Sequence, residues 1–419
     1  MSQLTLPDRT LWAPGQRPNA VLNGPKARVA KRGMELVDLS ALGFLPAIGG
    51  GSEGYHTVGD VVTRTADGVD LNSVWQDMLS LLNAVNGSRQ ALIRFLTFSV
   101  QNPVELVPQA GTGIDFEEAS EFGEPVGKRI SPTYFNMGYT FKWYDLAARY
   151  TWQYLAEATQ TMIDSVANAA VEAYWRKQLF EVLKTVFNAT NLSATINQQA
   201  YTVYKFYNND GTTPPSYKNN TFTSSHNHYR TTGAGALVAP DLDEMLDDFA
   251  SHGYSRATGY RTVIMMSRTT GEVVRGFRSV ANGGAGRFDF IPAQGQPGML
   301  ITTTQQMVGQ TAVPDTLEGL DVIGTYGEAY IVVDDWLPST HIFGFTTGGQ
   351  DNLGNPVGIR EHANTALRGL RLVKGRTPDY PLIDSFWNFG FGTGIRHRGA
   401  GMVMEITADA SYDPPAEYA

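Results

Sequence analysis

The sequence predicts an α+β protein in which several segments lack a core of their own. Residues 149–187 contain no Gly or Pro, which predicts one long helix. Residues 91–107 and 130–145 are rich in β-branched and aromatic side chains and predict the two strands of a long hairpin. Residues 240–370 alternate short helical and strand patterns, which indicates a separate α+β domain.

The composition favours a protein that covers much of its surface by self-association. Of its 419 residues, 17% are charged and 11% are aromatic, whereas globular chains average about 25% charged residues. The length predicts two or three domains of about 100–200 residues each. The net charge of −9 argues against a protein that grips nucleic acid, because such binding relies on Lys and Arg.

The lack of Cys excludes several kinds of site. There is no disulfide framework, no cysteine nucleophile, no Cys-ligated zinc and no iron–sulfur cluster. No apolar run approaches the ~18 residues of a membrane helix, and the N-terminal residues do not follow the pattern of a signal peptide. We therefore expect a soluble protein of the cytoplasm.

The first 87 residues divide into an irregular stretch and a helix. Pro and Gly interrupt residues 1–69, so this stretch cannot build its own core, and its apolar residues favour an arm that lies over other surfaces. From Asp70 to Val85 apolar residues recur at steps of three and four, which predicts an amphipathic helix ended by Gly87.

The predicted hairpin has a polar tip, QAGTGIDFEEASEFGEPVGKR, between its strands. The tip has too little apolar content to pack on itself, so it should protrude unless a neighbour receives it. Its charged residues include four acids followed by two bases: Glu117, Glu118, Glu121, Glu124, Lys128 and Arg129.

The predicted helix over 149–187 would be about 58 Å long at 1.5 Å per residue, enough for a beam across a flat domain. After it, Asn-Asp-Gly at 209–211 and Pro214-Pro215 indicate a hairpin turn. The next block predicts helices at Asp241–Ser251 and Thr269–Phe277, and strands at Arg261–Met266, Gly319–Ile323, Ala329–Val333 and His341–Phe345. A last strand, Ala400–Thr407, would return beside the long helix.

Two glycine motifs resemble catalytic or phosphate-binding loops without their context. Gly50-Gly51-Ser52-Glu53-Gly54 has the spacing of a nucleophile elbow, but it follows no buried strand and opens no helix. Gly390, Gly392 and Gly394 alternate without a following Lys-Ser/Thr, and we interpret them as positions where the backbone packs closely.

The histidines and paired acids form no recognisable catalytic or metal-binding arrangement either. His226 and His228 would face one side of a strand, so a metal site is conceivable, but the other histidines form no spaced cluster with carboxylates and a solvated or hydrogen-bonded pair is preferred. In a strand, neighbouring acids such as Asp247-Asp248 and Asp334-Asp335 would point to opposite faces. The sequence predicts no catalytic residue, no metal ligand and no cofactor.

This order of elements resembles the major capsid protein of tailed bacteriophages with the Hong Kong 97 fold. YIVVDDWLPSTHIFGF (330–345) is similar to the axial-domain segment of that family. FGFGTGIRHRGAGMVMEI (389–406) is similar to the C-terminal segment of actinobacterial phage capsids. The resemblance implies an N-terminal arm (1–87), an extended loop (88–146), a peripheral domain (147–239 and 371–419) with a spine helix at 149–187, and an axial domain (240–370).

The resemblance also implies a function. The chain would be a structural protein and not an enzyme. Its copies would form the hexamers and pentamers of an icosahedral shell around double-stranded DNA. It would be located in the virion after assembly in the host cytoplasm. Its partners would be further copies, the portal, and scaffolding or decoration proteins. The DNA would be enclosed without sequence-specific binding, and no membrane or cofactor is implied.

In relatives the extended loop lies over the peripheral domain of a neighbouring subunit. We predict that the acidic tip meets the basic loop that carries Lys374 and Arg376 across this boundary. Some relatives join the two by a Lys–Asn isopeptide bond. Lys128 lies in the right region, but no convincing Asn and Glu partners stand near 374–384, so we expect no crosslink.

Three alternatives stay open from the sequence alone. An encapsulin-type nanocompartment shares the shell fold but contains a protein cargo instead of DNA. A cytosolic hydrolase would use one of the Ser or Asp motifs above and form a small oligomer. A coiled-coil protein would use the apolar seam within 149–187 and would scatter as a rod.

Overall fold

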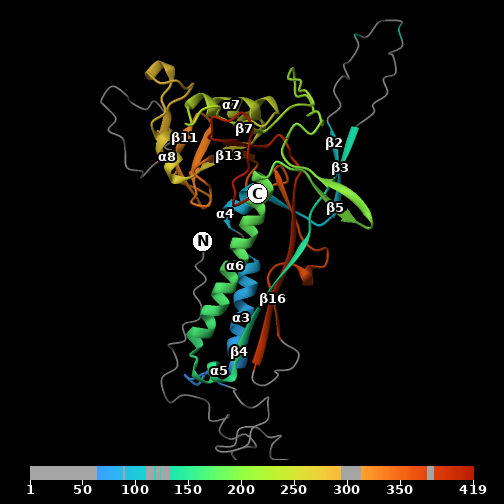
Figure 1. Cartoon of the computed structure of the whole chain (residues 1–419), viewed down its shortest axis with the longest axis vertical. Coiled ribbons are helices and arrows are strands. Elements are labelled where there is room, and N and C mark those ends of the chain that lie inside the picture. The colour runs from blue at the N-terminus through green and yellow to red at the C-terminus, as the bar shows by residue number, and fades with distance from the viewer. Residues whose placement is uncertain are drawn as a thin grey trace, which may run out of the picture. The chain divides into compact units, whose positions relative to one another are not determined.

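A computed structural model describes residues 64–87, 90–109, 118, 123, 133–293, 313–374 and 382–419 (Figure 1). The chain divides into two compact units. The described residues of the smaller unit are 64–76, 148–164, 374 and 382–385, and the larger unit contains the others. Most of the predicted N-terminal arm lies outside the described residues. None of the described helices is both long and apolar enough to cross a membrane.

Helix α3 (Leu71–Asn86) confirms the predicted amphipathic helix, and a turn at Gly87 follows it. The single helix predicted over 149–187 is wrong before Gln160. Strand β4 (Lys142–Thr151) continues to Thr151, the short α5 (Trp152–Glu157) follows, and α6 (Gln160–Phe187) begins only after an extended Ala158.

Three contacts explain this interruption. Thr151 Oγ1 accepts a hydrogen bond from the backbone N–H of Tyr154 at 3.2 Å and so caps α5. The carboxylate of Asp67 accepts from the N–H of Gln160 at 3.2 and 3.3 Å, which caps α6 from a distant part of the sequence. The backbone N–H of Ala66 also donates to the Ala158 carbonyl at 2.9 Å. In one helix over 149–187, bonds within the helix would replace all three contacts.

An eight-stranded sheet forms the centre of the larger unit, in the order β10 (Thr316–Leu317), β11 (Leu320–Tyr326), β12 (Ala329–Val333), β8 (Arg261–Met266), β13 (His341–Thr347), β17 (Gly401–Glu405) and β7 (Tyr229–Thr231). Strand β9 (Phe290–Pro292) pairs with β11. Helices α7 (Ala239–Ser251) and α8 (Arg268–Arg275) complete the predicted α+β pattern of this block. The final strand is confirmed, but its partners are β13 and β7, so it belongs to this sheet and not beside the long helix.

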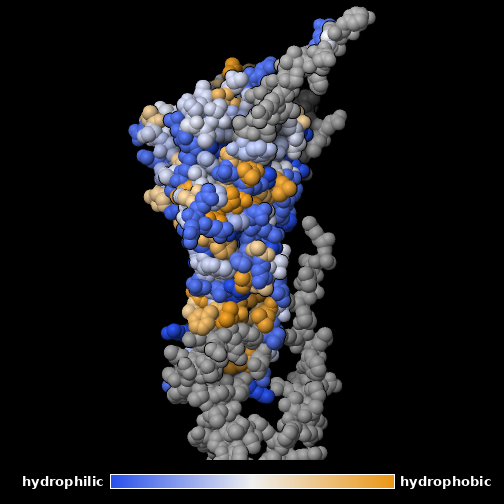
Figure 2. Space-filling view, turned by 90° about the vertical axis from the view of Figure 1, so that its right-hand side faces the viewer, coloured by the Kyte–Doolittle hydropathy of each residue, from blue (hydrophilic) through white to orange (hydrophobic). Residues whose placement is uncertain are grey.

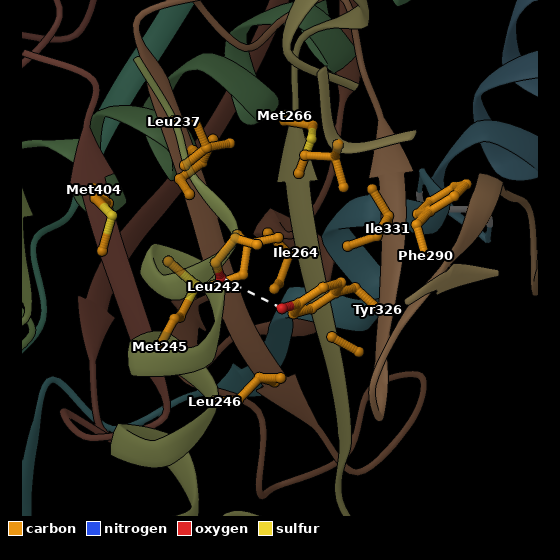
Figure 3. Packing of buried hydrophobic residues seen from close by; sticks show 14 of the residues in the cluster. Leu237, Leu242, Met245, Leu246, Ile264, Met266, Phe290, Tyr326, Ile331 and Met404 are labelled. Atoms are coloured by element: carbon orange, nitrogen blue, oxygen red, sulfur yellow. Dashed lines mark hydrogen bonds between the residues drawn. The ribbon is translucent and has the colours of Figure 1, made fainter. Parts of the chain in front are cut away.

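Strand β13 is buried on both faces, as its run of apolar residues requires. On one face, Leu242, Met245 and Phe249 of α7 pack against side chains of β8, β12, β13 and β17 (Figures 1 and 3). On the other face, the Phe343 ring lies 6.2 Å from Phe187 at the end of α6 and 6.1 Å from Phe206. The sheet is therefore covered by α7 on one side and by the end of α6 on the other.

A five-stranded sheet has the order β1 (Thr97–Val100), β14 (Val357–Arg360), β16 (Leu382–Ile395) and β15 (Arg371–Lys374), with β4 also paired to β16. The predicted strand over 91–107 is wrong at its start, where α4 (Ala91–Leu96) forms instead. Leu92, Ile93, Phe95 and Leu96 are all buried, and short apolar runs fit a buried helix as well as a strand. Thr97 Oγ1 donates to the Ile93 carbonyl at 2.6 Å where this helix ends.

Two hairpins complete the described strands. β2 (Val104–Gln109) pairs with β3 (Thr133–Gly138) and confirms the stem of the predicted long hairpin. β5 (Leu192–Ile196) pairs with β6 (Gln199–Val203), and Asn197 and Gln198 make the turn with φ of 50° and 66°. The hairpin turn predicted near 209–215 is thus misplaced. Short 3₁₀ turns lie at Arg256–Thr258, Val280–Asn282 and Thr365–Leu367.

The alternating glycines of β16 confirm the close-packing interpretation. An added Cβ at Gly390 would lie 2.6 Å from the ring of Trp143, one at Gly394 would lie 2.7 Å from the ring of Tyr139, and one at Gly392 would lie 1.5 Å from the carbonyl oxygen of Thr140. The Thr140 N–H also donates to the Thr393 carbonyl at 3.1 Å. This face of β16 therefore admits the backbone of the segment before β4 only because it has no side chains.

We predict that Gly392→Ala lowers the stability of the folded chain by about 3 kcal/mol or more, the upper end of overpacking costs, because a backbone atom and not a flexible side chain must move. The midpoint of thermal unfolding of the purified chain measures this. Gly235→Ala is the control, since an added Cβ there meets nothing within 4 Å. Equal midpoints for Gly392→Ala and the parent would contradict the prediction.

Candidate assembly surface

The stem of the extended hairpin is anchored at its base by a buried tyrosine. The Tyr139 hydroxyl donates to Glu105 Oε2 at 2.7 Å, and Glu105 Oε1 pairs with Arg396 at 3.2 Å. Burial and the neighbouring Glu105 carboxylate both raise the pKa of Tyr139, so its hydroxyl stays protonated as the donor. The base of the hairpin is thereby joined to the turn after β16.

Above this base the hairpin exposes apolar side chains. Leu106 and Tyr134 are 63% and 57% exposed, and the register of β2 with β3 places both on one face of the hairpin. β4 also exposes Trp143 and Leu146. These two side chains lie on opposite faces of the strand, because their positions differ by an odd number. Figure 2 shows hydrophobic residues gathered in separate patches on one face of the molecule.

The C-terminal motif places two arginines in the turn between β16 and β17. Arg398 is 4% exposed and its Nη2 lies 2.7 Å from Asp210 Oδ2, while its Nε donates to the Lys205 carbonyl at 2.8 Å. The guanidinium lies between the rings of Tyr204 and Tyr207, 4.8 and 4.5 Å from their centroids. Burial alone would raise the pKa of Asp210, but hydrogen bonds and Arg398 hold it below its ordinary value.

The 330–345 motif forms β12, a turn and β13, as its pattern predicts, although β8 lies between the two strands in the sheet. Asp334 Oδ1 accepts from the N–H of Trp336 at 2.9 Å in this turn, while Asp335 faces Arg268. On α7, Asp247 pairs with Arg287 and Asp248 with Arg230. The members of each acidic pair therefore have separate partners. The Gly-rich elbow motif at 50–54 lies outside the described residues.

The histidine pair is larger than the sequence indicates. His252, at the end of α7, joins His226 and His228, and the three rings lie within 5.0 Å of one another by their centroids. Burial lowers the pKa of His226 to about 4 and that of His252 to about 3, and it holds the pKa of His228 well below its ordinary value. The sequence predicts only a solvated or hydrogen-bonded pair, because His252 lies far along the chain and follows a helix.

Comparison with known proteins shows the family to which this fold belongs. No protein-family model matches the sequence, and no curated protein matches it. A solved structure from Mycobacterium phage Patience is 37% identical, with a TM-score of 0.68, over 88% of this chain and 97% of that chain. The chain belongs to the Hong Kong 97 type major capsid proteins of tailed phages.

More remote matches include the capsid of an empty GTA particle and the holo-SrpI encapsulin complex from Synechococcus elongatus. The first is 13% identical with a TM-score of 0.46, over 76% of this chain and 90% of that chain. The second is 12% identical with a TM-score of 0.43, over 77% of this chain and 89% of that chain. The 37% identity to the Mycobacterium phage Patience structure confirms the resemblance to the capsid family, its fold and the structural role of the chain.

Most residues predicted for the contact between capsid subunits lie outside the described residues. Of the charged tip residues predicted for this contact, only Glu118 is described, and it is exposed. Glu117, Glu121, Glu124, Lys128, Arg129 and the loop residue Arg376 are not described, and Lys374 is described only as the last residue of β15. The contact between tip and loop therefore stays a prediction.

We predict that Arg398→Leu destabilises this capsid protein by about 1–3 kcal/mol, because Asp210, whose side chain is 14% exposed, loses its ionic partner and the Lys205 carbonyl loses its buried donor. Adding Asp210→Leu should restore part of the loss, since no uncompensated charge remains. Arg94→Leu breaks an exposed pair with Asp351 and should cost only about 0–1 kcal/mol. Thermal unfolding of the parent and the three variants measures the order, and an Arg398→Leu midpoint equal to that of Arg94→Leu would contradict it.

Proposed function

We propose that this capsid protein assembles into the hexamers and pentamers of a closed icosahedral shell that encloses double-stranded DNA, and that it has no enzymatic role. The observation that carries the proposal is the 37% identity to the Mycobacterium phage Patience structure over nearly the whole of both chains. Closed shells suit a protein whose identical copies bury each other's surfaces.

The apolar side chains exposed in a single chain support self-association. They occur on the hairpin stem (Leu106, Tyr134), on β4 (Trp143, Leu146) and on further loops and helices, among them Leu353 at 65% and Val280 at 72% exposed. The strand β4 is exposed over most of its length, on both sides. Neighbouring subunits that cover these residues would gain roughly 25 cal/mol for each Å² of apolar surface removed from water.

The remaining partners follow from the architecture of such shells. The net charge of −9 supports a wall that encloses DNA without clamping its phosphates. A portal, and scaffolding or decoration proteins, are the expected further partners, with assembly in the host cytoplasm. The N-terminal arm (1–87), the extended loop (88–146), the peripheral domain (147–239 and 371–419) and the axial domain (240–370) are the proposed divisions of the chain.

Electron microscopy of the chain expressed alone tests assembly. We expect closed shells, and size-exclusion chromatography should place most of the protein in the void volume. A stable monomer or small oligomer at high concentration would refute the proposal. Analysis of particles from infected cells separates a phage capsid, which contains DNA, from an encapsulin-type compartment, which contains a protein cargo.

We further propose that the acidic loop tip meets the basic peripheral loop of a neighbouring subunit. The tip contributes Glu117, Glu118, Glu121 and Glu124, and the facing loop contributes Lys374 and Arg376. Exposed ion pairs contribute only about 0–1 kcal/mol each, so the contact would set register and angle between subunits, and its effect would repeat over the whole lattice.

A charge swap tests this contact. Glu121→Lys with Glu124→Lys should reduce the yield of shells and their resistance to heat and salt, because like charges then face each other. Combining these changes with Lys374→Glu and Arg376→Glu should restore assembly. Electron microscopy and light scattering on heating measure both. Shells of the first variant that resist heat and salt as the parent does would show that the contact is absent or unimportant.

A further inference from the structure

Three histidines distant in sequence bring their Nε2 atoms together. Nε2 of His226 lies 2.9 Å from Nε2 of His228 and 2.9 Å from Nε2 of His252, and the third distance is 3.1 Å. Among the residues that the structure describes, this is the one group of three or more His, Asp and Glu side chains whose ligand atoms converge in this way. The three nitrogens form a nearly equilateral triangle.

Backbone contacts hold the three residues in place. His228 is fully buried, its N–H donates to the Tyr207 carbonyl at 2.7 Å, and its carbonyl accepts from the N–H of Val403 in β17 at 2.9 Å. His226 lies two residues earlier in the same loop, and its carbonyl accepts from the N–H of Asn209 at 3.1 Å. His252 caps the C-terminus of α7, and its N–H donates to the Asp248 carbonyl at 3.1 Å.

No placement of protons on three neutral imidazoles makes all three Nε2–Nε2 contacts favourable. Nδ1 of His228 lies 2.7 Å from the Gly401 carbonyl oxygen, which can only accept, so Nδ1 carries the proton and Nε2 of this neutral ring presents a lone pair. If His226 and His252 both direct an Nε2–H toward it, their two N–H groups face each other across 2.9 Å. If only one does, the other presents a second lone pair to its neighbours. At least one of the three contacts is repulsive in any neutral arrangement.

A cation on the axis of the triangle removes this repulsion, because it uses all three lone pairs. An ion at the usual Zn–N distance of about 2.0–2.1 Å from each nitrogen would lie just outside the plane of the triangle. The Gly401 carbonyl already provides the outer hydrogen bond that orients a metal-binding imidazole. The end of α7 also favours a cation, since helix carbonyls point toward it.

The surrounding aromatic rings fix the imidazoles before an ion binds. His252 stacks on Phe222 at 4.1 Å with an interplanar angle of 3°, and on Tyr207 at 5.8 Å and 9°. Tyr207 also contacts the rings of His226 and His228 at 5.9 and 5.7 Å. Little conformational entropy would then be lost on binding.

The nearby positive charge is balanced. Arg230 follows His228 by two residues and would oppose a cation, but its guanidinium is paired with the carboxylates of Glu244 and Asp248 on α7. Arg398, whose guanidinium lies 4.5 Å from the centroid of the Tyr207 ring, is paired with Asp210. Neither arginine therefore presents an uncompensated charge to the cluster.

We infer that His226, His228 and His252 bind a divalent transition metal of the zinc class, with a water molecule in the fourth position. Imidazole nitrogen suits zinc, copper and nickel, and it does not suit magnesium or calcium. The ion is structural: it joins the loop before β7 to the end of α7. The inference does not depend on shell assembly, because all three ligands come from one chain.

Metal content and thermal unfolding of the full chain test the site. Chain purified without chelator from zinc-supplemented medium should contain about one zinc per chain by mass spectrometry of the metal. Removal of zinc with EDTA should lower the unfolding midpoint by about 3–8 °C, and zinc but not magnesium should restore it. A zinc content near zero together with no midpoint change on adding zinc would overturn the inference.

Two variants separate this site from adventitious binding. His226→Gln should lose the metal and the response of its midpoint to zinc, whereas His362→Gln, outside the cluster, should keep both. Equal zinc content in the two variants would place the metal elsewhere and refute the site. If His226→Gln does not fold, Co²⁺ added to the zinc-free parent decides: the strong visible absorption of a four-coordinate site is expected, and a weak octahedral spectrum would refute it.

Discussion

One C-terminal segment belongs to both large sheets, and much of the larger unit depends on it. β16 ends at Ile395 in the five-stranded sheet, and β17 begins at Gly401 in the eight-stranded sheet, so the five residues between them must fix how the two sheets meet. This turn is held by direct contacts: the Thr346 N–H donates to the Ala400 carbonyl at 2.8 Å, and Arg398 reaches Asp210. The missing side chains of Gly390, Gly392 and Gly394 let β16 approach the segment before β4 on the other side. All three features therefore act on the junction between the two sheets.

Polar side-chain contacts, and not regular strand pairing, hold the stretch between β6 and β7. Apart from isolated bridges such as Asn208↔Asn227, its described backbone forms no ladder. Its position is set by side chains. Arg398 holds its first part at Asp210 and at the Lys205 carbonyl, and Lys205 Nζ donates to the Thr185 carbonyl of α6 at 3.0 Å. Burial lowers the pKa of Lys205 to about 7, which reflects how little water reaches it. Buried charged groups of this kind add little net stability, but each has few satisfactory positions, so they specify one path for the chain.

The sequence predicts well where the determining contacts are local. The apolar spacing of Asp70–Val85 and Asp241–Ser251, and the β-branched runs of β8, β12 and β13, correspond to elements of the structure because each pattern reports burial of its own residues. It fails where a distant residue decides. Asp67 caps α6, so the break before Gln160 cannot be read from the Gly- and Pro-free run, and His252 joins His226 and His228 only because α7 ends beside the loop before β7. The stem of the hairpin was predictable, whereas the partner of Arg398 was not, since Asp210 lies in a stretch without periodicity.

A capsid subunit must expose apolar surface for its neighbours and must also hold that surface in a fixed orientation. A side chain such as Leu106 or Tyr134 gains free energy only when a neighbour covers it, so the hairpin must hold one orientation before the neighbour arrives. The base of the hairpin meets this need through Tyr139, Glu105 and Arg396, and Arg396 belongs to the same turn that Arg398 fixes. The orientation of the exposed hairpin is thereby linked to the buried junction of the two sheets. A loosened junction would then weaken the contacts between subunits even though no residue at the interface had changed, because each copy would lose more conformational entropy on joining the lattice.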